Sequence, residues 1–321
     1  MKYAAALVLA AVGANAASSL IPSGISSGCS TFLTTLDTNS TLQSCINPLI
    51  TATSAFSPTA STAATSAQVD AALKTLCVSS SGCDDATVRT WLNNFWGACT
   101  TELQAGNSKV LELYDVLYVF SPLQSAICSK DSGTGAYCVK EIASNTTTSS
   151  SSSNKAVSNS TSLVAQTSDL TAAISVASSY LSQYVTSLKR RVGFERAATS
   201  DLATIITPNA TTYQSTNLPF LFLQPSMASS ALCTPCTREI FVSYIKWEYK
   251  APYGPGLSSS PILGGQSDLW SAIGSTCGSS FVSAINAEAG VSTATASGAG
   301  RQALPAFGAI VAGAVAFIMV A

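Results

Sequence analysis

The chain has 321 residues, of which only 10% are charged, and 15 Lys and Arg nearly balance 16 Asp and Glu. This balance provides no basic surface for nucleic acid, so we expect no nucleic-acid partner. The sequence contains no histidine, which excludes Ser-His and Cys-His catalytic pairs. Phosphate-loop and dinucleotide-binding motifs are also missing.

Residues 1–16 have the features of a secretory signal peptide. Lys2 is followed by a run rich in Ala, Leu and Val, and Ala14-Asn15-Ala16 matches an A-x-A cleavage site. No polar face accompanies the run, which argues against a buried first helix. We therefore expect a mature chain that begins near Ala17 and folds in the secretory pathway.

The spacing of apolar residues is mostly helical in the two halves of the expected ectodomain, 17–142 and 163–288. From Asp84 to Leu103 apolar residues recur every three or four positions, and Asp84 or Asp85 is placed as the N-cap. Trp270, Ile273 and Cys277 repeat the spacing after Ser267, the predicted N-cap of a second helix. Further helices are expected at 68–77, 109–120, 163–190 and 237–249.

Three other stretches are predicted to lack helical structure. Residues 143–162 are rich in Ser and Thr and contain few apolar side chains, so we expect a disordered, O-glycosylated linker. Residues 51–68 have a milder form of the same composition. The apolar run 218–226, between prolines, is expected to form a strand or a buried extended loop.

Two kinds of modification site lie on this framework. The basic cluster 188–196 suits the end of a helix, with dibasic processing at Lys189 and Arg190 as the alternative. N-x-S/T sequons predict N-glycosylation at Asn39, Asn145, Asn159 and Asn209.

Residues 289–302 and 303–321 together resemble a GPI-attachment signal. Small and polar residues come first, and from Ala306 to Ala321 no charged residue interrupts the apolar run. A helix of that length spans roughly 24 Å, short of a hydrocarbon core of about 30 Å. A short tail anchor or a buried helix is the alternative. The expected attachment residue is Ser297 or Gly298, with Ser292 as a rival.

Ten cysteines in a secreted chain indicate disulfides rather than a metal centre, because zinc sites usually include histidine. Seven precede residue 143 and three follow residue 162. Since both counts are odd, at least one bridge must cross the linker, unless each half keeps a free cysteine. Cys99 and Cys277 both fall on predicted buried faces, which makes Cys99–Cys277 one candidate crossing bridge. The ten are Cys29, Cys45, Cys77, Cys83, Cys99, Cys128, Cys138, Cys233, Cys236 and Cys277.

Cysteines that are close in sequence suggest a local disulfide motif that occurs three times. Each of the segments 76–88, 127–142 and 232–240 has the form expected of a disulfide-tied turn between two helices. The Cys-Thr-Pro-Cys stretch at 233–236 has the spacing of thiol oxidoreductases but not their strand–helix–strand context. We interpret it as structural, either a tied turn or two cysteines with distant partners.

Carboxylates and aromatic residues are the remaining candidates for a site. Two carboxylates acting as acid and base could hydrolyse a glycan, but most of those here occupy helix starts or helix surfaces; they are Asp84, Asp85, Glu102, Glu112, Asp115, Glu141, Glu239, Glu248 and Asp268. Aromatic residues could line a sugar or lipid site, although their helical spacing favours a role in the core; they are Trp91, Trp96, Tyr114, Tyr118, Tyr244, Trp247 and Trp270.

The blocks 113–142 and 218–281 resemble an uncharacterised family of secreted, often GPI-anchored fungal proteins known only as a domain of unknown function. The resemblance rests on Cys-Thr-Pro-Cys, a Gly-Gln-Ser helix start at 265–267 and Ser-Thr-Cys-Gly at 275–278, and it spans most of residues 29–287. It implies a fungal surface protein and supplies no catalytic residues. The closely spaced eight-cysteine pattern of fungal haem-binding surface domains does not match.

The sequence thus predicts a mainly α-helical, disulfide-stapled ectodomain with a Ser/Thr-rich disordered loop, at the outer leaflet of the plasma membrane or in the cell wall. Its expected role is non-catalytic: structural, adhesive or ligand-binding, without a cofactor. Expected partners are the membrane, through the GPI lipid, and cell-wall glycans or a small apolar ligand. The alternatives are a lipid or sterol carrier with an enclosed apolar cavity and a carboxylate-dependent glycan hydrolase.

Overall fold

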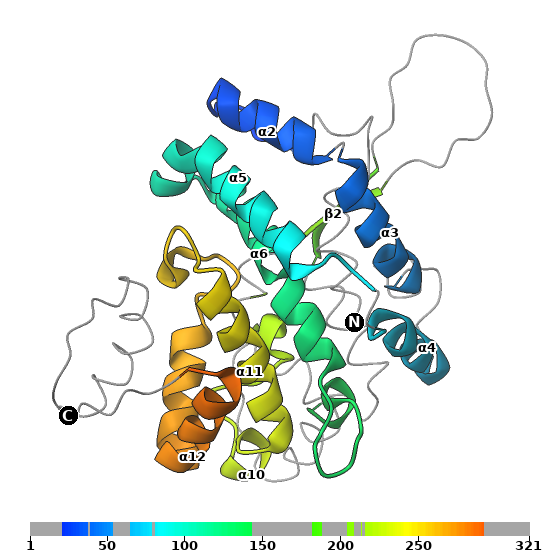
Figure 1. Ribbon diagram of the computed structural model, residues 1–321, viewed down its shortest axis with the longest axis vertical. Coiled ribbons are helices and arrows are strands. Elements are labelled where there is room, and N and C mark those ends of the chain that lie inside the picture. The colour runs from blue at the N-terminus through cyan, green and yellow to red at the C-terminus, as the bar shows by residue number, and fades with distance from the viewer. Residues whose placement is uncertain are drawn as a thin grey trace, which may run out of the picture.

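The computed structural model describes residues 21–37, 39–53, 65–78, 81–142, 182–187, 204–208, 213 and 216–291. Within them the fold is mainly helical, as predicted (Figure 1). The helices are α2 (Ser27–Asp37), α3 (Ser40–Thr53), α4 (Ser66–Leu76), α5 (Asp85–Gln104), α6 (Ser108–Cys128), α10 (Ser229–Leu232), α11 (Pro235–Lys250) and α12 (Gln266–Ala289), with 3-10 turns η4 (Leu218–Phe220) and η5 (Leu257–Ser259).

Helix α6 is the central element of the described fold. It packs against both α5 and α11, and α11 packs in turn against α12, as Figure 1 shows. Val110, Tyr118, Val119 and Ala126 are all fully buried although they point in different directions around α6. A helix with neighbours on several sides is apolar around most of its circumference, which explains this pattern.

Local signals fix where the helices begin. Asp84 caps α5 by accepting a hydrogen bond from the Thr87 amide at 2.9 Å, and Thr234 caps α11 in the same way, with Pro235 in its first turn. The predicted helices 68–77, 84–103 and 237–249 are confirmed within a few residues. Ser267 is not an N-cap, because α12 begins one residue earlier and Gly265 occupies the capping position.

Two helical boundaries differ from the expectation. The helix predicted at 109–120 continues through Pro122 to Cys128, because the buried residues that follow the proline outweigh its missing hydrogen bond. The stretch 51–68 is helical at both ends: α3 runs to Thr53, and a Thr65–Gln68 capping box opens α4. Residues 54–64 lie outside the described part. Helices α2 and α3 were not predicted.

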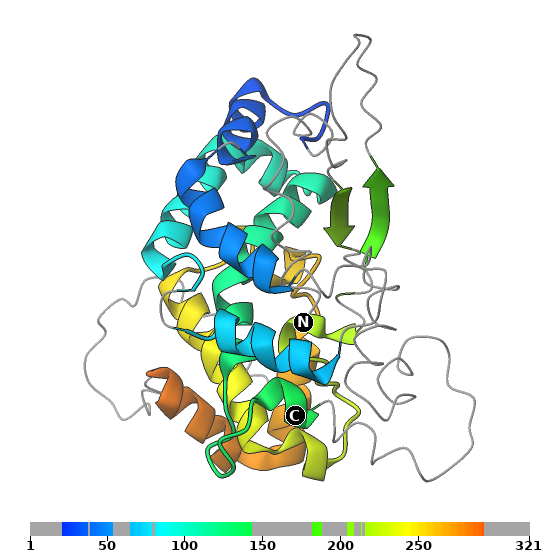
Figure 2. The same ribbon diagram turned by 90° about the vertical axis from the view of Figure 1, so that its right-hand side faces the viewer.

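One segment predicted as helix is a strand. β1 (Ser182–Ser187) pairs antiparallel with β2 (Thr204–Pro208), with Val185 opposite Ile206 and Thr186 opposite Ile205. Figure 2 shows the two strands side by side. The prediction for 163–190 is therefore wrong at 182–187, where β-branched residues on both strands favour the extended ladder. The rest of that range lies outside the described residues.

The run 218–226 begins with a buried 3-10 turn and is not a strand; of the two expected forms, it keeps the burial of the loop but not its extended backbone. Asn217 adopts a left-handed conformation (φ 49°), and its carbonyl accepts hydrogen bonds from the Phe220 and Phe222 amides at 2.9 and 3.1 Å. Its side-chain amide donates to the Leu223 carbonyl at 3.0 Å. Asn tolerates this conformation because its side chain can satisfy nearby backbone groups.

All ten cysteines are paired, and one bridge joins the two halves. Cys138–Cys236 crosses the segment 143–162, as the odd counts require. The expected pair Cys99–Cys277 and the three tied turns are wrong, because a buried helix face does not specify which helix lies opposite. The Cys-Thr-Pro-Cys cysteines have distant partners, as the structural interpretation allowed. The other bridges are Cys29–Cys99, Cys45–Cys83, Cys77–Cys128 and Cys233–Cys277.

Several predicted segments lie outside the described residues. They are the signal peptide, the Ser/Thr-rich linker 143–162, the basic cluster 188–196 and residues 292–321. In the part of the chain that the structure describes, no helix combines the length and the hydrophobicity needed to cross a bilayer.

Candidate functional site: a polar groove between α6 and α11

Several of the predicted carboxylates have local structural roles. Asp84 is the N-cap of α5, Glu112 pairs with Lys109 at 2.9 Å, and Asp268 lies exposed in the first turn of α12. Glu141 accepts a hydrogen bond from the Thr134 hydroxyl at 2.6 Å. These four side chains stabilise helix ends, a helix surface and a loop.

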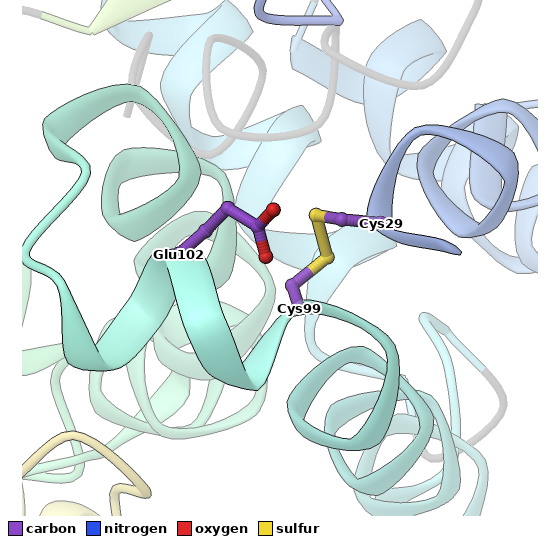
Figure 3. Close-up of side chains that lie close together, drawn as sticks. All are labelled: Cys29, Cys99 and Glu102. Atoms are coloured by element: carbon purple, nitrogen blue, oxygen red, sulfur yellow. A yellow bond between two sulfur atoms is a disulfide. The ribbon is translucent and has the colours of Figure 1, made fainter. Parts of the chain in front are cut away.

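Glu102 ties α5 to the start of α2. Its Oε1 accepts a hydrogen bond from the Ser26 amide at 2.6 Å, and this bond lowers the pKa of the carboxyl group. The side chain is only 7% exposed. Figure 3 shows the carboxyl group directed toward the Cys29–Cys99 disulfide, which lies where α5 departs from helical geometry at Cys99. Glu102 therefore holds two helices together at a kink.

Two clusters of sulfur and oxygen atoms resemble metal sites only by distance. Among the described residues, Cys29, Cys99 and Glu102 form one cluster, and Asp131, Glu141 and Cys236 form the other. All three sulfurs belong to disulfides, and a metal requires the thiolate. In the second cluster, Asp131 already accepts hydrogen bonds from the amides of Gly133 and Thr134. The sulfur atoms of both clusters are therefore unavailable as metal ligands.

Asp115 on α6 is the centre of a buried hydrogen-bond network. It accepts bonds from the Ser260 hydroxyl at 2.6 Å, from the Ile262 amide at 2.9 Å and from the Tyr253 hydroxyl. Burial raises the pKa of Asp115 to about 7, while these three hydrogen bonds oppose the increase. Asp115, Tyr253, Ser260 and Ile262, hereafter the Asp115 network, fix the loop between α11 and α12 onto α6.

Glu248 on α11 is less well satisfied than Asp115. Burial raises the pKa of Glu248 to about 7, and a hydrogen bond from the Gln266 side chain opposes the increase. Its Oε1 has no hydrogen-bond partner among the described residues, and neither has the Oε1 of Gln266. Asp115 and Glu248 thus come from different helices and accept hydrogen bonds from different donors.

A polar groove lies between the C-terminal half of α6 and the outer face of α11, and the start of α5 forms one edge. We refer to it as the α6–α11 groove. Its volume of about 330 Å³ is near the lower limit for ligand pockets, about 300–1,000 Å³. It is lined by Asp85, Ser121, Pro122, Ser125, Ser129, Glu239, Val242, Ser243, Lys246, Trp247 and Lys250.

Two polar groups in the groove wall are buried without a partner. Ser121 is 6% exposed and Trp247 is 3% exposed, and neither the Ser121 hydroxyl nor the Trp247 indole N–H has a partner among the described residues. Each unsatisfied group costs about 1–3 kcal/mol. Pro122 has no N–H, so the Tyr118 carbonyl loses the donor that position 122 would supply. The wall thus offers both donors and acceptors.

The charges around the groove are balanced. Lys246 and Lys250 on α11 are exposed and form no ion pair with another described residue. Asp85 lies at the first residue of α5. Glu239 lies 3.6 Å from Arg238, and burial, followed by the nearby charge of Glu288, raises its pKa. Two cations and two carboxylates therefore surround the groove.

The aromatic candidates belong to the core, as their spacing indicated. Tyr114, Tyr118, Tyr244 and Trp247 are buried, and Tyr118 packs edge-on against both Trp247 and Tyr253. Trp91, Trp96 and Trp270 are partly buried against the same core. Only Trp247 also contributes to the groove.

Of the predicted modification sites, only Asn39 lies among the described residues. Asn39 accepts a hydrogen bond from the Leu42 amide at 2.8 Å and so caps α3. Asn145, Asn159, Asn209, the three candidate attachment residues and the dibasic pair lie outside the described part. Sequence reasoning missed the groove, since its serines and lysines have no motif and tertiary packing brings them together.

The fold and the groove define a class of protein: a disulfide-stapled helical domain with a small polar cleft. The chain belongs to the family of a domain of unknown function (DUF7729), whose model matches residues 16–191. The match agrees with the expectation of an uncharacterised domain family, and the Cys-Thr-Pro-Cys block, on which the expectation partly rested, lies outside it. No curated protein matches the chain, and no solved structure matches it.

Proposed function

We propose that the chain is a non-catalytic fungal cell-surface glycoprotein, anchored by GPI, whose ectodomain has a ligand-binding role. The observation that carries the proposal is the complete pairing of ten cysteines. Five disulfides are typical of proteins that fold in an oxidising compartment. The signal-like segment 1–16 and the sequons support secretion, and the small-residue segment 289–302 with the apolar residues after it supports the lipid anchor.

The test is the release of the full chain from intact cells. Phosphatidylinositol-specific phospholipase C is expected to move it into the medium, and a variant lacking residues 303–321 should reach the medium without the enzyme. The released protein should contain the Cys138–Cys236 peptide pair on a non-reducing mass-spectrometric map. Retention of the chain after phospholipase treatment, while another anchored protein is released, would contradict the proposal.

A glycan hydrolase remains the second candidate because one observation favours it. Asp85 and Glu239, two of the nine predicted carboxylates, line the same groove, and the raised pKa of Glu239 suits a general acid. The ion pair of Glu239 with Arg238 and the place of Asp85 in the first turn of α5 favour structural roles instead. Release of reducing ends from a soluble β-glucan, abolished by Glu239→Gln, would establish the hydrolase; no release by the wild type would remove it.

The carrier alternative has less support. It requires an enclosed apolar cavity, whereas the α6–α11 groove is lined by four serines and four charged side chains. A lipid or sterol would leave those polar groups desolvated and unpaired. We therefore do not propose a carrier function for this groove.

A further inference from the structure

We propose that the α6–α11 groove binds a short neutral saccharide segment, through hydrogen bonds to its hydroxyl groups and through ring contact with Tyr249 at its rim. This inference rests on the ligand-binding role proposed above and specifies the class of ligand. It concerns the groove alone and does not depend on how the chain is attached to the cell.

The buried orphan groups are the reason to expect a ligand at all. The Ser121 hydroxyl and the Trp247 indole N–H are more than nine-tenths buried, line the groove and have no partner among the described residues. Buried polar groups in folded proteins are nearly always paired. A ligand whose hydrogen-bonding atoms reached these two groups from the groove would satisfy both.

The chemistry of the lining selects a ligand rich in hydroxyl groups. Serine hydroxyls both donate and accept, the indole N–H only donates, and carboxylates only accept. A sugar hydroxyl can match each of these in turn. Lys246 and Lys250 would favour an anion, but Asp85 and Glu239 line the same groove and oppose it. A neutral ligand avoids this conflict.

Tyr249 supplies an apolar surface beside the polar groove. It is 73% exposed, one of the few large hydrophobic side chains that the described residues leave in solvent. On α11 it lies seven residues after Val242 and three after Lys246, both of which line the groove. Helical periodicity places residues with these separations on neighbouring positions of one face. Tyr249 therefore stands at the rim, where the apolar face of a sugar ring can pack on it.

The first experiment is titration of the purified full-length chain, with its disulfides intact and its own N-glycans trimmed. Laminaritetraose, chitotetraose and cellotetraose serve as neutral probes and inorganic phosphate as the anionic one. At least one tetrasaccharide should bind with a Kd of about 1 mM or lower. The affinity should change less than twofold or so between low and high salt, because no net charge is neutralised. No saccharide binding, or salt-sensitive phosphate binding that excludes the saccharide, would overturn the inference.

Two variants locate the binding. Ser121→Ala removes one hydroxyl and should weaken saccharide binding about tenfold, as expected for one lost hydrogen bond. Tyr249→Ala should weaken it severalfold through lost ring contact. Ser280→Ala, at an exposed serine on α12, is the matched control and should bind like the wild type. If Ser121→Ala and Tyr249→Ala bind as tightly as Ser280→Ala, the saccharide binds elsewhere and the inference is wrong.

The two proposals can fail separately. Binding by purified protein that phospholipase does not release would contradict the anchor and leave the saccharide site intact. Release without binding would have the opposite meaning.

Discussion

The Asp115 network and the α6–α11 groove lie along the same helix, with Asp115 and Ser121 less than two helical turns apart. Around Asp115 both carboxylate oxygens accept hydrogen bonds from buried donors. In the groove, Ser121 and Trp247 keep buried polar atoms without partners in the described structure. Buried polar groups therefore have two different roles in this protein. In the Asp115 network they are hydrogen-bonded and fix the loop between α11 and α12, whereas in the groove wall they are unpaired and can bind a ligand. Substitutions in each region should therefore change different properties.

The largest effect is expected at Asp115. Asp115→Ala leaves the hydroxyls of Tyr253 and Ser260 and the amide of Ile262 buried without their acceptor, so the free energy of unfolding should fall by about 3 kcal/mol or more. Urea denaturation measures the loss. Glu112→Ala, one turn earlier on α6, removes only the ion pair with Lys109 and should cost less than about 1 kcal/mol. Equal losses in the two variants would show that the network does not stabilise the loop.

An intermediate loss is expected at Tyr253. Tyr253→Phe keeps the buried ring against Tyr118 but removes one donor to Asp115, which should lower the free energy of unfolding by about 1–2 kcal/mol. The same measurement on Tyr249→Phe, at an exposed tyrosine, should show no change. If Tyr253→Phe left the free energy of unfolding unchanged, the hydrogen bonds from Ser260 and Ile262 would satisfy the Asp115 carboxyl group without the Tyr253 hydroxyl.

A substitution at Glu248 should raise the free energy of unfolding rather than lower it, and the effect should depend on pH. Its pKa in the folded protein, about 7, exceeds the ordinary 4.5, so between these pH values the folded state holds a proton that the unfolded chain has released. Stability from this group is complete below about pH 4.5 and is lost as pH rises to 7. Glu248→Gln cannot ionise, and its amide can donate to the unpaired Gln266 Oε1.

The measurement for Glu248→Gln is thermal unfolding across pH. Above pH 7 the variant should be more stable than the wild type by about 1 kcal/mol, and the advantage should shrink toward pH 4. Asp115 titrates in the same window in both proteins, so the difference between the two curves isolates Glu248. A constant difference at all pH values would show that Glu248 is not the titrating group.

The smallest effect on stability is expected at Ser121. Ser121→Ala removes a buried hydroxyl that has no partner in the described structure, so the free energy of unfolding should change by less than about 0.5 kcal/mol, or rise slightly. This result would sharpen the contrast with Asp115, which lies six residues before Ser121 on the same helix. A loss above about 1.5 kcal/mol would reveal a structural hydrogen bond and weaken the case for a ligand site.

Local patterns predicted the helices whose signals are local. The apolar spacing and the Asp84 cap located α5 to within about one residue, because both act within a few positions of the chain. The helix predicted at 109–120 ends before Pro122, a residue that normally disfavours a helix interior. Burial of Leu123, Ala126 and Ile127 beyond it keeps α6 helical. The free energy gained by burying these three side chains depends on tertiary packing, which the local sequence does not show.

The site depended on information that no local pattern contains. Asp115 belonged to the predicted carboxylates, but only its donors from positions 253–262 distinguish it from Glu112. Cys99 was correctly expected on a buried face, yet its partner is Cys29 rather than Cys277. The groove joins Ser121 to Trp247, which lie on different helices. Pairing across such separations is decided by tertiary packing.

The Cys138–Cys236 bridge has a consequence for how the length of this chain can change. It holds the end of the first half against the start of α11, and its two cysteines are separated by 98 in the sequence. Because the bridge fixes both ends, doubling the length of the intervening chain would cost only about 0.6 kcal/mol in closure entropy. Insertions and deletions in the intervening chain should therefore cost little while the helices on either side keep their positions, so chains that share this bridge are expected to differ most in the spacing between its two cysteines.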